Sequence, residues 1–587
     1  MSLRPLLHSA WPGKANTPLT QLDLAFARTL NSLQASADER HLWLAALVSH
    51  QWGRGHACLD VHAWPEGAAD VLGWPTAAVQ ALPNQLAEAV PTLPWAMGEH
   101  SPLVVQGQRL YLRRAWDAEQ SIHHGLMALQ HRVLPTPTDL SPQLDALFAP
   151  DPSDMQRAAC AHAVQHAVTL ITGGPGTGKT TTVVKLLRLL QATADAPLRI
   201  LLTAPTGKAA ARLAQAISQA RGQLPALEHA HWPSAAHTLH KLLQTQRDAT
   251  PRLDADVVVV DEASMIDLEL MARLVTAVPS SARLVLLGDK DQLASVEAGA
   301  VMAQLCQAPW LAQHTMALVK SHRFDAEQGI GPWARAANAG DSPTLQTLWA
   351  QAPQACFREG AAVSRISRIH SHDSDTLQGL RQAWTPWLTL LEPHLHGQPC
   401  DDAQALALLA SFSRVGVLCA MREGPWGVNA FNAQLQGALG FADAPWYVGR
   451  PVMARRNDYA LGLMNGDTGL CLLRWVHGEA RLRVAFADGQ GGIRWQVPSR
   501  LAAVDTVFAM TVHQSQGSEF EQVLLVLPDQ PAPLLTRELV YTGMTRARQQ
   551  LCVWAPDPAL LITACERTVQ RSGGLAALGD PRSTVAK

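Results

Sequence analysis

The stretch AVTLITGGPGTGKTTTVVKLLRLL, residues 167–190, decides the fold class of this chain. A run of apolar residues typical of a buried strand leads directly into a glycine-rich turn, and a helical pattern of apolar residues follows. Strand, glycine turn and helix in this order form a phosphate-binding P-loop, because glycines let main-chain N–H groups wrap the phosphates and the helix N-terminus adds its dipole. The stretch therefore predicts a nucleotide-binding α/β domain.

The loop and a downstream acidic motif supply the expected chemistry. Lys179 is predicted to hold the β- and γ-phosphates of ATP, and Thr180 to bind Mg²⁺. In VVVVDEAS (257–264), Asp261 at a strand end suits Mg²⁺, and Glu262 suits activation of the attacking water. The other nucleotide-binding candidates in the loop are Gly173, Gly174, Pro175, Gly176, Thr177, Gly178 and Thr181. These parts alone predict an ATPase or GTPase and do not separate motors from transporters or metabolic kinases.

The same strand–turn–helix pattern recurs at 199–217, 255–274 and 281–293, and a second α/β region begins near 413. Apolar strands that alternate with helices predict a parallel sheet covered on both faces. Short strands separated by Asn-Gly, Asp-Gly and His-Gly turns predict a small β-barrel insertion. The expected domains are a mostly helical N-terminal domain at 1–125, a first motor domain at 145–340, and a second at 341–587 that contains the insertion at 445–503.

Composition limits the class of protein. The chain has 587 residues, 47% of them hydrophobic and 16% charged, with a formal net charge of −2. A nucleic-acid partner is therefore not indicated by bulk charge, and a binding groove must be local. The nine cysteines form no CxxC pair, which argues against a zinc or iron–sulfur site and favours a reducing compartment. With no signal-like N-terminus and no apolar run long enough for a membrane helix, we expect a cytoplasmic protein without membrane contact.

Six further segments resemble motifs of superfamily-1 helicases and occur in that family's order. They are TAPTGKAAARL (203–213), AHTLHKLL (236–243), LLGDKDQLASVEAG (286–299), KSHRF (320–324), AMTVHQSQGSEF (509–520) and VYTGMTRARQQL (540–551), similar to motifs Ia, Ib, III, IV, V and VI. The resemblance implies an ATP-dependent DNA helicase with two RecA-like domains. The forms of motifs Ia, Ib and V look like the 5′→3′ branch, so the expected polarity rests on resemblance alone.

The resemblance also implies roles around the nucleotide. Gln156, in DMQRAA before the P-loop, matches the residue that contacts adenine, and Gln292 matches the one that senses the γ-phosphate. Arg323 and Arg546 match two arginine fingers that stabilise charge on the transferred phosphoryl group. Glu519 is expected to couple motif V to the nucleotide, whereas Arg548 is expected to be structural.

DNA contacts are expected in the turns that follow the strands. Hydroxyls and backbone amides in such turns suit phosphate contacts, and these positions bind DNA without reading its sequence. The candidates are Thr203, Thr206, Lys208, Thr238, His240, Thr511, His513, Ser515 and Gln516.

The N-terminal segments LVSHQWGRGHACLD (47–60) and PLVVQGQRLYLRRAW (102–116) resemble the RecD family, the alpha subunits of exodeoxyribonuclease V, or RecBCD. The NGDTG turn of the insertion, SH3-like in that family, fits as well. This resemblance implies a motor on single-stranded and duplex-end DNA, with RecB and RecC as partners and recombinational double-strand-break repair as the process. No nuclease constellation is seen in this chain.

Three alternatives stay open at this point. The chain could be a standalone RecD-like helicase, although the helix-hairpin-helix pattern of that longer class is not seen. It could be an ATP-binding regulatory subunit with little hydrolysis, which Glu262, Arg323 and Arg546 speak against. It could be a non-helicase P-loop enzyme such as a small-molecule kinase, which the motif set argues against.

Overall fold

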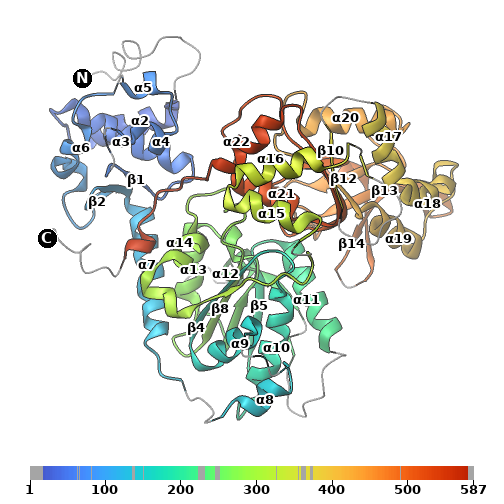
Figure 1. Ribbon diagram of the computed structural model, residues 1–587, viewed down its shortest axis with the longest axis horizontal. Coiled ribbons are helices and arrows are strands. Elements are labelled where there is room, and N and C mark those ends of the chain that lie inside the picture. Colours follow the sequence, from blue (N-terminus) through green and yellow to red (C-terminus); the bar gives the residue numbers. More distant parts are fainter. Residues whose placement is uncertain are drawn as a thin grey trace.

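The computed structural model describes residues 18–62, 64, 66–80, 82–134, 139–149, 151, 153–221, 232–233, 235–244, 252–324, 327–354, 356–357, 365–369, 374–489 and 491–578. Residues 1–17, on which the expected absence of a signal sequence rests, lie outside this part. Figure 1 shows an N-terminal body in blue, a first α/β body in teal and green, and a second in yellow to red. Among the helices described, none combines the length and the apolar character that crossing a membrane requires.

The first α/β body is built on a six-stranded sheet in which every pair is parallel, as the sequence predicts. Its strands, in spatial order, are β6 (Ala236–Thr238), β5 (Ile200–Ala204), β7 (Val257–Val260), β8 (Arg283–Gly288), β4 (Val168–Gly173) and β9 (Thr315–Leu318). In β7, Val257 and Val259 face one hydrophobic core while Val258 and Val260 face another. The sheet is therefore buried on both sides, which explains its uninterrupted apolar strands.

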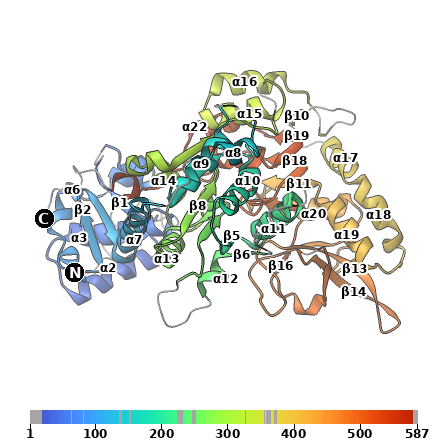
Figure 2. The same cartoon turned by 90° about the horizontal axis from the view of Figure 1, so that it is seen from below.

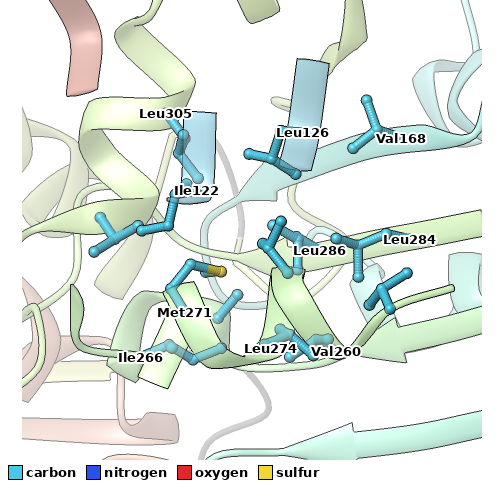
Figure 3. Close-up of a cluster of buried hydrophobic side chains, with 14 of the residues drawn as sticks. Ile122, Leu126, Val168, Val260, Ile266, Met271, Leu274, Leu284, Leu286 and Leu305 are labelled. Atoms are coloured by element: carbon cyan, nitrogen blue, oxygen red, sulfur yellow. The ribbon is translucent and has the colours of Figure 1, made fainter. Parts of the chain in front are cut away.

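Helices cover the two faces of this sheet. On one face lie α9 (Met155–Gln165), α10 (Lys179–Ala192) and α11 (Gly207–Arg221). On the other lie α7 (Arg113–Gln130), α12 (Leu239–Gln244), α13 (Leu268–Ala277) and α14 (Val301–Gln307). Figure 3 shows this second core, where Ile122 and Leu126 of α7 approach Met271 and Leu274 of α13 above the sheet. The predicted boundary at 125 falls inside α7, which thus belongs to two bodies at once.

The N-terminal body pairs two helices with a small sheet. Helices α2 (Gln21–Leu33) and α3 (Glu39–Gly53) pack together and begin at the side-chain caps Thr20 and Asp38. The antiparallel strands β2 (Leu103–Gln106) and β3 (Arg109–Leu112) follow later in the chain, and α7 begins directly after β3. The rest comprises β1 (Cys58–Asp60), which completes the antiparallel order β1-β3-β2, and α4 (Ala68–Leu72), α5 (Thr76–Gln80) and α6 (Leu86–Ala89).

The second α/β body has its own parallel sheet. The strand order is β10 (Arg365–Ile369), β19 (Ala547–Trp554), β18 (Phe520–Val526), β11 (Val415–Cys419) and β17 (Ala509–Thr511). One face packs on α15 (Ile330–Ala339), α16 (Ser342–Gln351), α21 (Arg537–Met544) and α22 (Pro558–Glu566). The other packs on α17 (Ser374–Ala383), α18 (Thr385–Leu395), α19 (Asp402–Phe412) and α20 (Val428–Ala438). Trp384 and Trp387 are fully buried in that second layer.

A separate antiparallel sheet lies within this second body, between α20 and β17. Its order is β15 (Ile493–Gln496), β14 (Glu479–Ala487), β13 (Thr468–Val476), β12 (Pro451–Ala454) and β16 (Val504–Thr506). The hairpin between β13 and β14 turns at His477 and Gly478, whose φ angles are 51° and 82°. Two positive φ values at the centre of a two-residue turn match the twist of the strands. Figure 2 shows this sheet beside the first body, near α11.

The C-terminal segment returns from the second body to the other two, as the red trace in Figure 1 shows. The amide of Ala57 donates to the Ser572 carbonyl at 2.8 Å, and the indole of Trp310 donates to the Leu575 carbonyl at 3.1 Å. The amide of Gly574 donates to the carboxylate of Glu119 on α7, at 2.8 and 3.1 Å. Residues far apart in sequence thus meet where the N-terminal body joins the first sheet.

Glu119 makes this junction sensitive to pH. Burial raises the pKa of its carboxyl to about 7, and the Gly574 amide only partly offsets that effect. The folded protein therefore holds a proton that the unfolded chain releases near pH 4.5. This contribution is fully present below pH 4.5 and is lost as the pH rises through 7, an effect on the order of 3 kcal/mol.

We expect Glu119→Gln to remove the loss of folding stability that the original chain shows as the pH rises through 7. The stability of the variant relative to the original chain should increase between pH 5 and pH 8, measured as the midpoint of the calorimetric transition that involves the N-terminal body. Glu88→Gln, at an exposed position on α6, is the matched control and should follow the original chain. Parallel pH profiles for all three proteins would contradict the assignment.

Candidate active site

A cavity of about 530 Å³ lies between the two parallel sheets, at the P-loop. Both bodies contribute to its walls. The residues that line it are Gln156, Pro175, Gly176, Gly178, Lys179, Thr180, Thr181, Lys185, Ala209, Arg212, Asp261, Glu262, Gln292, His322, Arg323, Gly517, Glu519 and Arg546. Every residue predicted for catalysis is among them, whereas Gly173, Gly174 and Thr177 of the loop are not part of the lining.

The P-loop runs from the end of β4 to the first turn of α10. Gly176 and Gly178 have φ angles of 80° and 83°, which side chains other than glycine rarely adopt. A Cβ atom on Gly176 would also collide with Arg323, and one on Gly178 with the amide of Gln156. The ammonium of Lys179 donates to the carbonyls of Gly173 and Gly174 at 2.6 and 3.2 Å. The ammonium group thus lies over the P-loop, where Lys179 is predicted to hold the β- and γ-phosphates of ATP.

Gln156 lies at the side of the cavity predicted for adenine. Its amide nitrogen donates to the Thr177 carbonyl at 3.0 Å and lies 3.4 Å from Nε2 of His322. The main chain of His322 in turn donates to the Gly176 carbonyl at 2.8 Å. The start of α9, the P-loop and the segment after β9 are therefore joined at one edge of the site.

The two acidic residues after β7 have different environments. Burial, reinforced by the adjacent Glu262, raises the pKa of Asp261 to about 6, and Lys179 opposes that shift. A bound cation would favour the charged carboxylate. Glu262 has a φ of 53°, a left-handed conformation that is costly for a residue with a side chain. Such strain at the end of a buried strand is characteristic of functional sites, and Glu262 lines the cavity.

Glu519 holds arginines from both bodies at the mouth of the cavity. Its Oε1 lies 2.6 Å from Nη2 of Arg212 on α11 and 2.8 Å from Nη2 of Arg323, after β9. Its Oε2 lies 2.9 Å from Nη2 of Arg548 on its own body. Although burial opposes ionisation, Arg212 and Arg323 hold the pKa of Glu519 far below its usual range. The carboxylate is thus charged at any working pH, and three guanidinium groups surround it.

Arg323 and Arg546 stand at the cavity from opposite bodies. The Nη1 atom of Arg323 is buried and has no hydrogen-bond partner. Burial lowers the pKa of Arg323, which Glu519 partly restores. Arg546 is 2% exposed and donates to the carbonyls of Thr542 and Ser518, both at 3.2 Å. An unsatisfied buried donor beside a P-loop is suited to a phosphate oxygen.

Further contacts join motif III to motifs V and VI. The Tyr541 hydroxyl donates to Asp289 at 3.1 Å, and the Leu293 amide donates to the Thr542 hydroxyl at 2.9 Å. The amide of Gln516 donates to the Leu293 carbonyl at 2.8 Å. Gln292, predicted to sense the γ-phosphate, donates to Asp289 at 2.9 Å. Bonded groups thus connect Gln292 in the cavity wall to the second body.

The predicted DNA-binding residues fall into two groups. Thr203 and Ser515 are fully buried and donate to the carbonyls of His237 and Val512, while the side chain of Gln516 bonds to Leu293. The others are half-buried: Thr206, Lys208, Thr238, His240, Thr511 and His513. Burial lowers the pKa of Lys208 to about 8, against the attraction of Asp467 in the NGDTG turn of the insertion. Burial also lowers the pKa of His513. Contact of these residues with DNA stays a prediction.

Sequence reasoning missed several residues of this site. It did not predict Arg212, although this residue lies four positions after Lys208 and so on the same side of α11. Asp289 and Tyr541 lie inside motifs III and VI, but nothing in the sequence signals that they pair. Lys185 and His322 also line the cavity.

An ATP-sized cavity between two parallel sheets, with a P-loop and acidic pair on one side and an arginine from the other, defines a two-domain motor of the superfamily-1 helicase class. Comparison with known families agrees with this class. Residues 156–298 match an AAA domain, and residues 506–554 a UvrD-like helicase C-terminal domain. Residues 15–111 match the N-terminal domain of the RecBCD enzyme subunit RecD.

Relatives that align with most of this chain identify the family within the helicase class. RecBCD enzyme subunit RecD of Mycobacterium tuberculosis (strain CDC 1551 / Oshkosh) is 37% identical, over 94% of this chain and 93% of its own. The ATP-dependent RecD2 DNA helicase of Deinococcus radiodurans is 30% identical, over 72% of this chain and 52% of its own. A Bacteroides Pif1 helicase bound to ADP-AlF3 and single-stranded DNA aligns with 74% of this chain and 95% of its own, at 15% identity and a TM-score of 0.37. The chain belongs to the RecD subunit family.

The position of Glu519 yields a prediction for nucleotide binding. In the structure its carboxylate bonds Nη2 of Arg323, so an incoming γ-phosphate at the free Nη1 would compete with it for the charge of that guanidinium. We expect Glu519→Gln to tighten binding of a non-hydrolysable ATP analogue without DNA by about tenfold, the equivalent of about 1.4 kcal/mol. Fluorescence titration measures this. Glu521→Gln, two residues further along the chain and outside the cavity, removes an ion pair with Arg414. It is the control and should bind like the original chain. Weaker binding by the Glu519 variant would refute the competition.

Proposed function

We propose that this chain is an ATP-driven motor that moves 5′→3′ on single-stranded DNA and unwinds duplex ends as the RecD subunit of a RecBCD-type exodeoxyribonuclease V. The observation that carries this proposal is the cavity whose wall includes the P-loop of one body and Arg546 of the other. Such a cavity is completed only when the two bodies are together, so the phosphate chemistry depends on their relative position. A simple nucleotide-binding clamp needs neither a strained Glu262 nor arginines from two sides.

The catalytic steps follow from the positions of the side chains. Lys179 and the loop amides bind the phosphates, and Gln156 orients the base from the start of α9. Glu262 orients the water and takes its proton, while Arg323 and Arg546 stabilise the charge on the transferred phosphoryl group. When phosphate leaves, Arg323 returns to Glu519, and the bonded path through Gln292, Asp289 and Tyr541 adjusts.

Mg²⁺ fits this cavity. The hydroxyl of Thr180 and the carboxylate of Asp261 both line it, and hard oxygen donors are what this ion prefers. When bound, the ion would neutralise charge on the β- and γ-phosphates. Asp261 has a pKa of about 6, so its carboxylate is mostly ionised and available at neutral pH.

DNA would cross the strand-end turns of both sheets, near the half-buried Thr206, Lys208, Thr238, His240, Thr511 and His513. The antiparallel sheet at 451–506, proposed to be an SH3-like insertion, lies beside this track. The side chain of its Met464 stands against Gly207 in the turn of motif Ia. A duplex substrate that approaches that turn would therefore meet the insertion.

The N-terminal body is proposed to dock on RecB and RecC. It carries an apolar groove of about 510 Å³ lined by residues that include Leu22, Phe26, Trp52 and Leu112. Leu22 is 74% exposed, an unusual position for a leucine beside other apolar side chains. Co-expression with the two partner chains and isolation of a 1:1:1 complex tests this part separately, while a stable, fully active single chain would favour a standalone helicase.

Steady-state ATP hydrolysis tests the motor assignment. We expect single-stranded DNA to stimulate the chain at least about tenfold, because DNA favours the closed arrangement of the two bodies. Lys179→Gln should abolish ATP hydrolysis both with and without DNA, since a phosphate-binding donor contributes about 10²–10³-fold to the rate. Hydrolysis that does not respond to DNA, in the chain alone and with its partners, would favour the non-helicase P-loop enzyme instead. Polarity is measured from unwinding of 5′-tailed against 3′-tailed duplexes.

Arg546→Ala tests the contribution of the second body. We expect kcat to fall at least about 10²-fold while nucleotide binding changes only a few-fold, because the arginine acts on the transition state. Arg548→Ala is the matched control two residues away. Its side chain is half exposed and lies outside the cavity wall, so its loss should cost little. Equal effects of the two substitutions would show that Arg546 acts only through packing.

A further inference from the structure

Three histidines that the motor mechanism does not use gather on the first α/β body. His162 and His166 lie one turn apart at the end of α9, and His314 ends the short 3₁₀ helix η4 (Pro309–His314) just before β9. One ring nitrogen of each lies within 4.8 Å of those of the other two. The ring centroids of His162 and His166 are 3.9 Å apart with the rings stacked at 14°, and both lie 5.0–5.3 Å from that of His314. An imidazole binds a metal ion in its ring plane, so one of the stacked rings must rotate about its side-chain bonds to share an ion with the other two.

The hydrogen bonds around the rings leave a free ring nitrogen on His166 and on His314, whereas His162 also contacts the Gln313 carbonyl. Nδ1 of His166 lies 3.0 Å from the His162 carbonyl, so it carries the proton and Nε2 is free to accept. Nδ1 of His162 lies 3.2 Å from the Thr169 hydroxyl. Nδ1 of His314, a residue only 5% exposed, is buried and has no hydrogen-bond partner. Main-chain and hydroxyl partners of this kind are those that orient metal-binding histidines.

We propose that His162, His166 and His314 form a binding site for a first-row transition-metal ion of the zinc class, with water in the remaining position. Three imidazoles at these separations suit Zn²⁺, Co²⁺ or Ni²⁺ better than hard cations, which prefer oxygen. His162 and His166 are half-buried, so an ion can enter from solvent, while His314 closes the inner side. The ion would replace the contact between His162 and the Gln313 carbonyl.

Such an ion would join two segments that frame the nucleotide cavity. Helix α9 begins next to Gln156, which contacts the P-loop, and ends at the cluster. Strand β9 starts directly after His314, pairs with β4, and leads to Arg323. An ion at the far end of both segments would stiffen the frame without touching the phosphates. Ion binding itself does not depend on the motor assignment.

The test is a Co²⁺ titration of the full-length chain without a polyhistidine tag, stripped with chelator and free of nucleotide. We expect one ion per chain, and His166→Gln should weaken binding by at least about tenfold. His396→Gln, at an exposed histidine on the second body, is the matched control and should bind as tightly as the original chain. Equal affinity of all three proteins, or no stoichiometric ion in the original chain, would overturn the site.

Two further measurements identify the ligand atoms and check the fold of the variant. X-ray absorption of the bound ion should show nitrogen or oxygen neighbours at roughly 2.0–2.1 Å, whereas sulfur at about 2.3 Å would assign the ion to a cysteine and overturn the proposal. The thermal midpoint without metal checks that the variant is folded. Saturating Co²⁺ should raise the midpoint of the original chain and of the His396 variant only. If His166→Gln is unfolded, His162→Gln takes its place.

Discussion

The carboxylate of Glu519 is the charge on which the cleft depends. The Glu519 carboxylate is largely buried from water, and guanidinium groups stabilise its charge instead. Two of these groups, those of Arg212 and Arg323, come from the opposite α/β body. The Glu519 carboxylate carries one negative charge and the three arginines around it carry three positive charges. The excess positive charge can be neutralised by a nucleoside triphosphate. Arg323 bonds the second body through Nη2 and keeps Nη1 free on the cavity side. If Arg323 acts as the proposed arginine finger, the same guanidinium would join the contact between the bodies to the nucleotide.

The sequence predicts those parts of the structure whose cause is local. The P-loop is set by its own glycines and adjoining strand, and the parallel sheets by apolar runs such as 257–260, whose alternate residues face opposite cores. Lys179, Asp261 and Glu262 line one cavity because their motifs follow the carboxyl ends of β4 and β7 in the same parallel sheet, whereas Arg546 reaches it from the start of β19 in the second sheet. By contrast, the bond between Asp289 and Tyr541 joins residues 252 positions apart. It depends on how two bodies dock, which no local pattern encodes.

For the predicted DNA-binding residues, the direction of each side chain matters as well as the position of its motif in the sequence. Thr203, Ser515 and Gln516 lie in segments expected to face DNA, yet their polar atoms bond to main-chain carbonyls inside the protein. In a strand-to-helix turn neighbouring side chains point to opposite sides, so a motif can be placed correctly while only some of its residues reach the surface. The bond from Gln516 to Leu293 makes that residue a link between motifs V and III. Helix α7, inside which the predicted boundary at 125 falls, packs on α13 of the first body and on β2 and β3 of the N-terminal body.

The distribution of contacts among the three bodies indicates where motion can occur. The N-terminal body shares α7 and its buried leucines with the first sheet, and that continuous apolar packing resists separation. The two α/β bodies meet at a cleft bridged by ion pairs and hydrogen bonds, which are largely buried and can be exchanged only if new polar partners replace the old ones. The C-terminal segment crosses from the second body to the first, where Arg571 donates to the carbonyls of Glu297 and Gly299 at 2.6 and 3.1 Å. Because that tether is fixed on the side of the N-terminal body, opening of the cleft is expected to rotate the second body about the tethered side. The arginines of motifs IV and VI lie in the cleft and would then report each opening directly to the nucleotide.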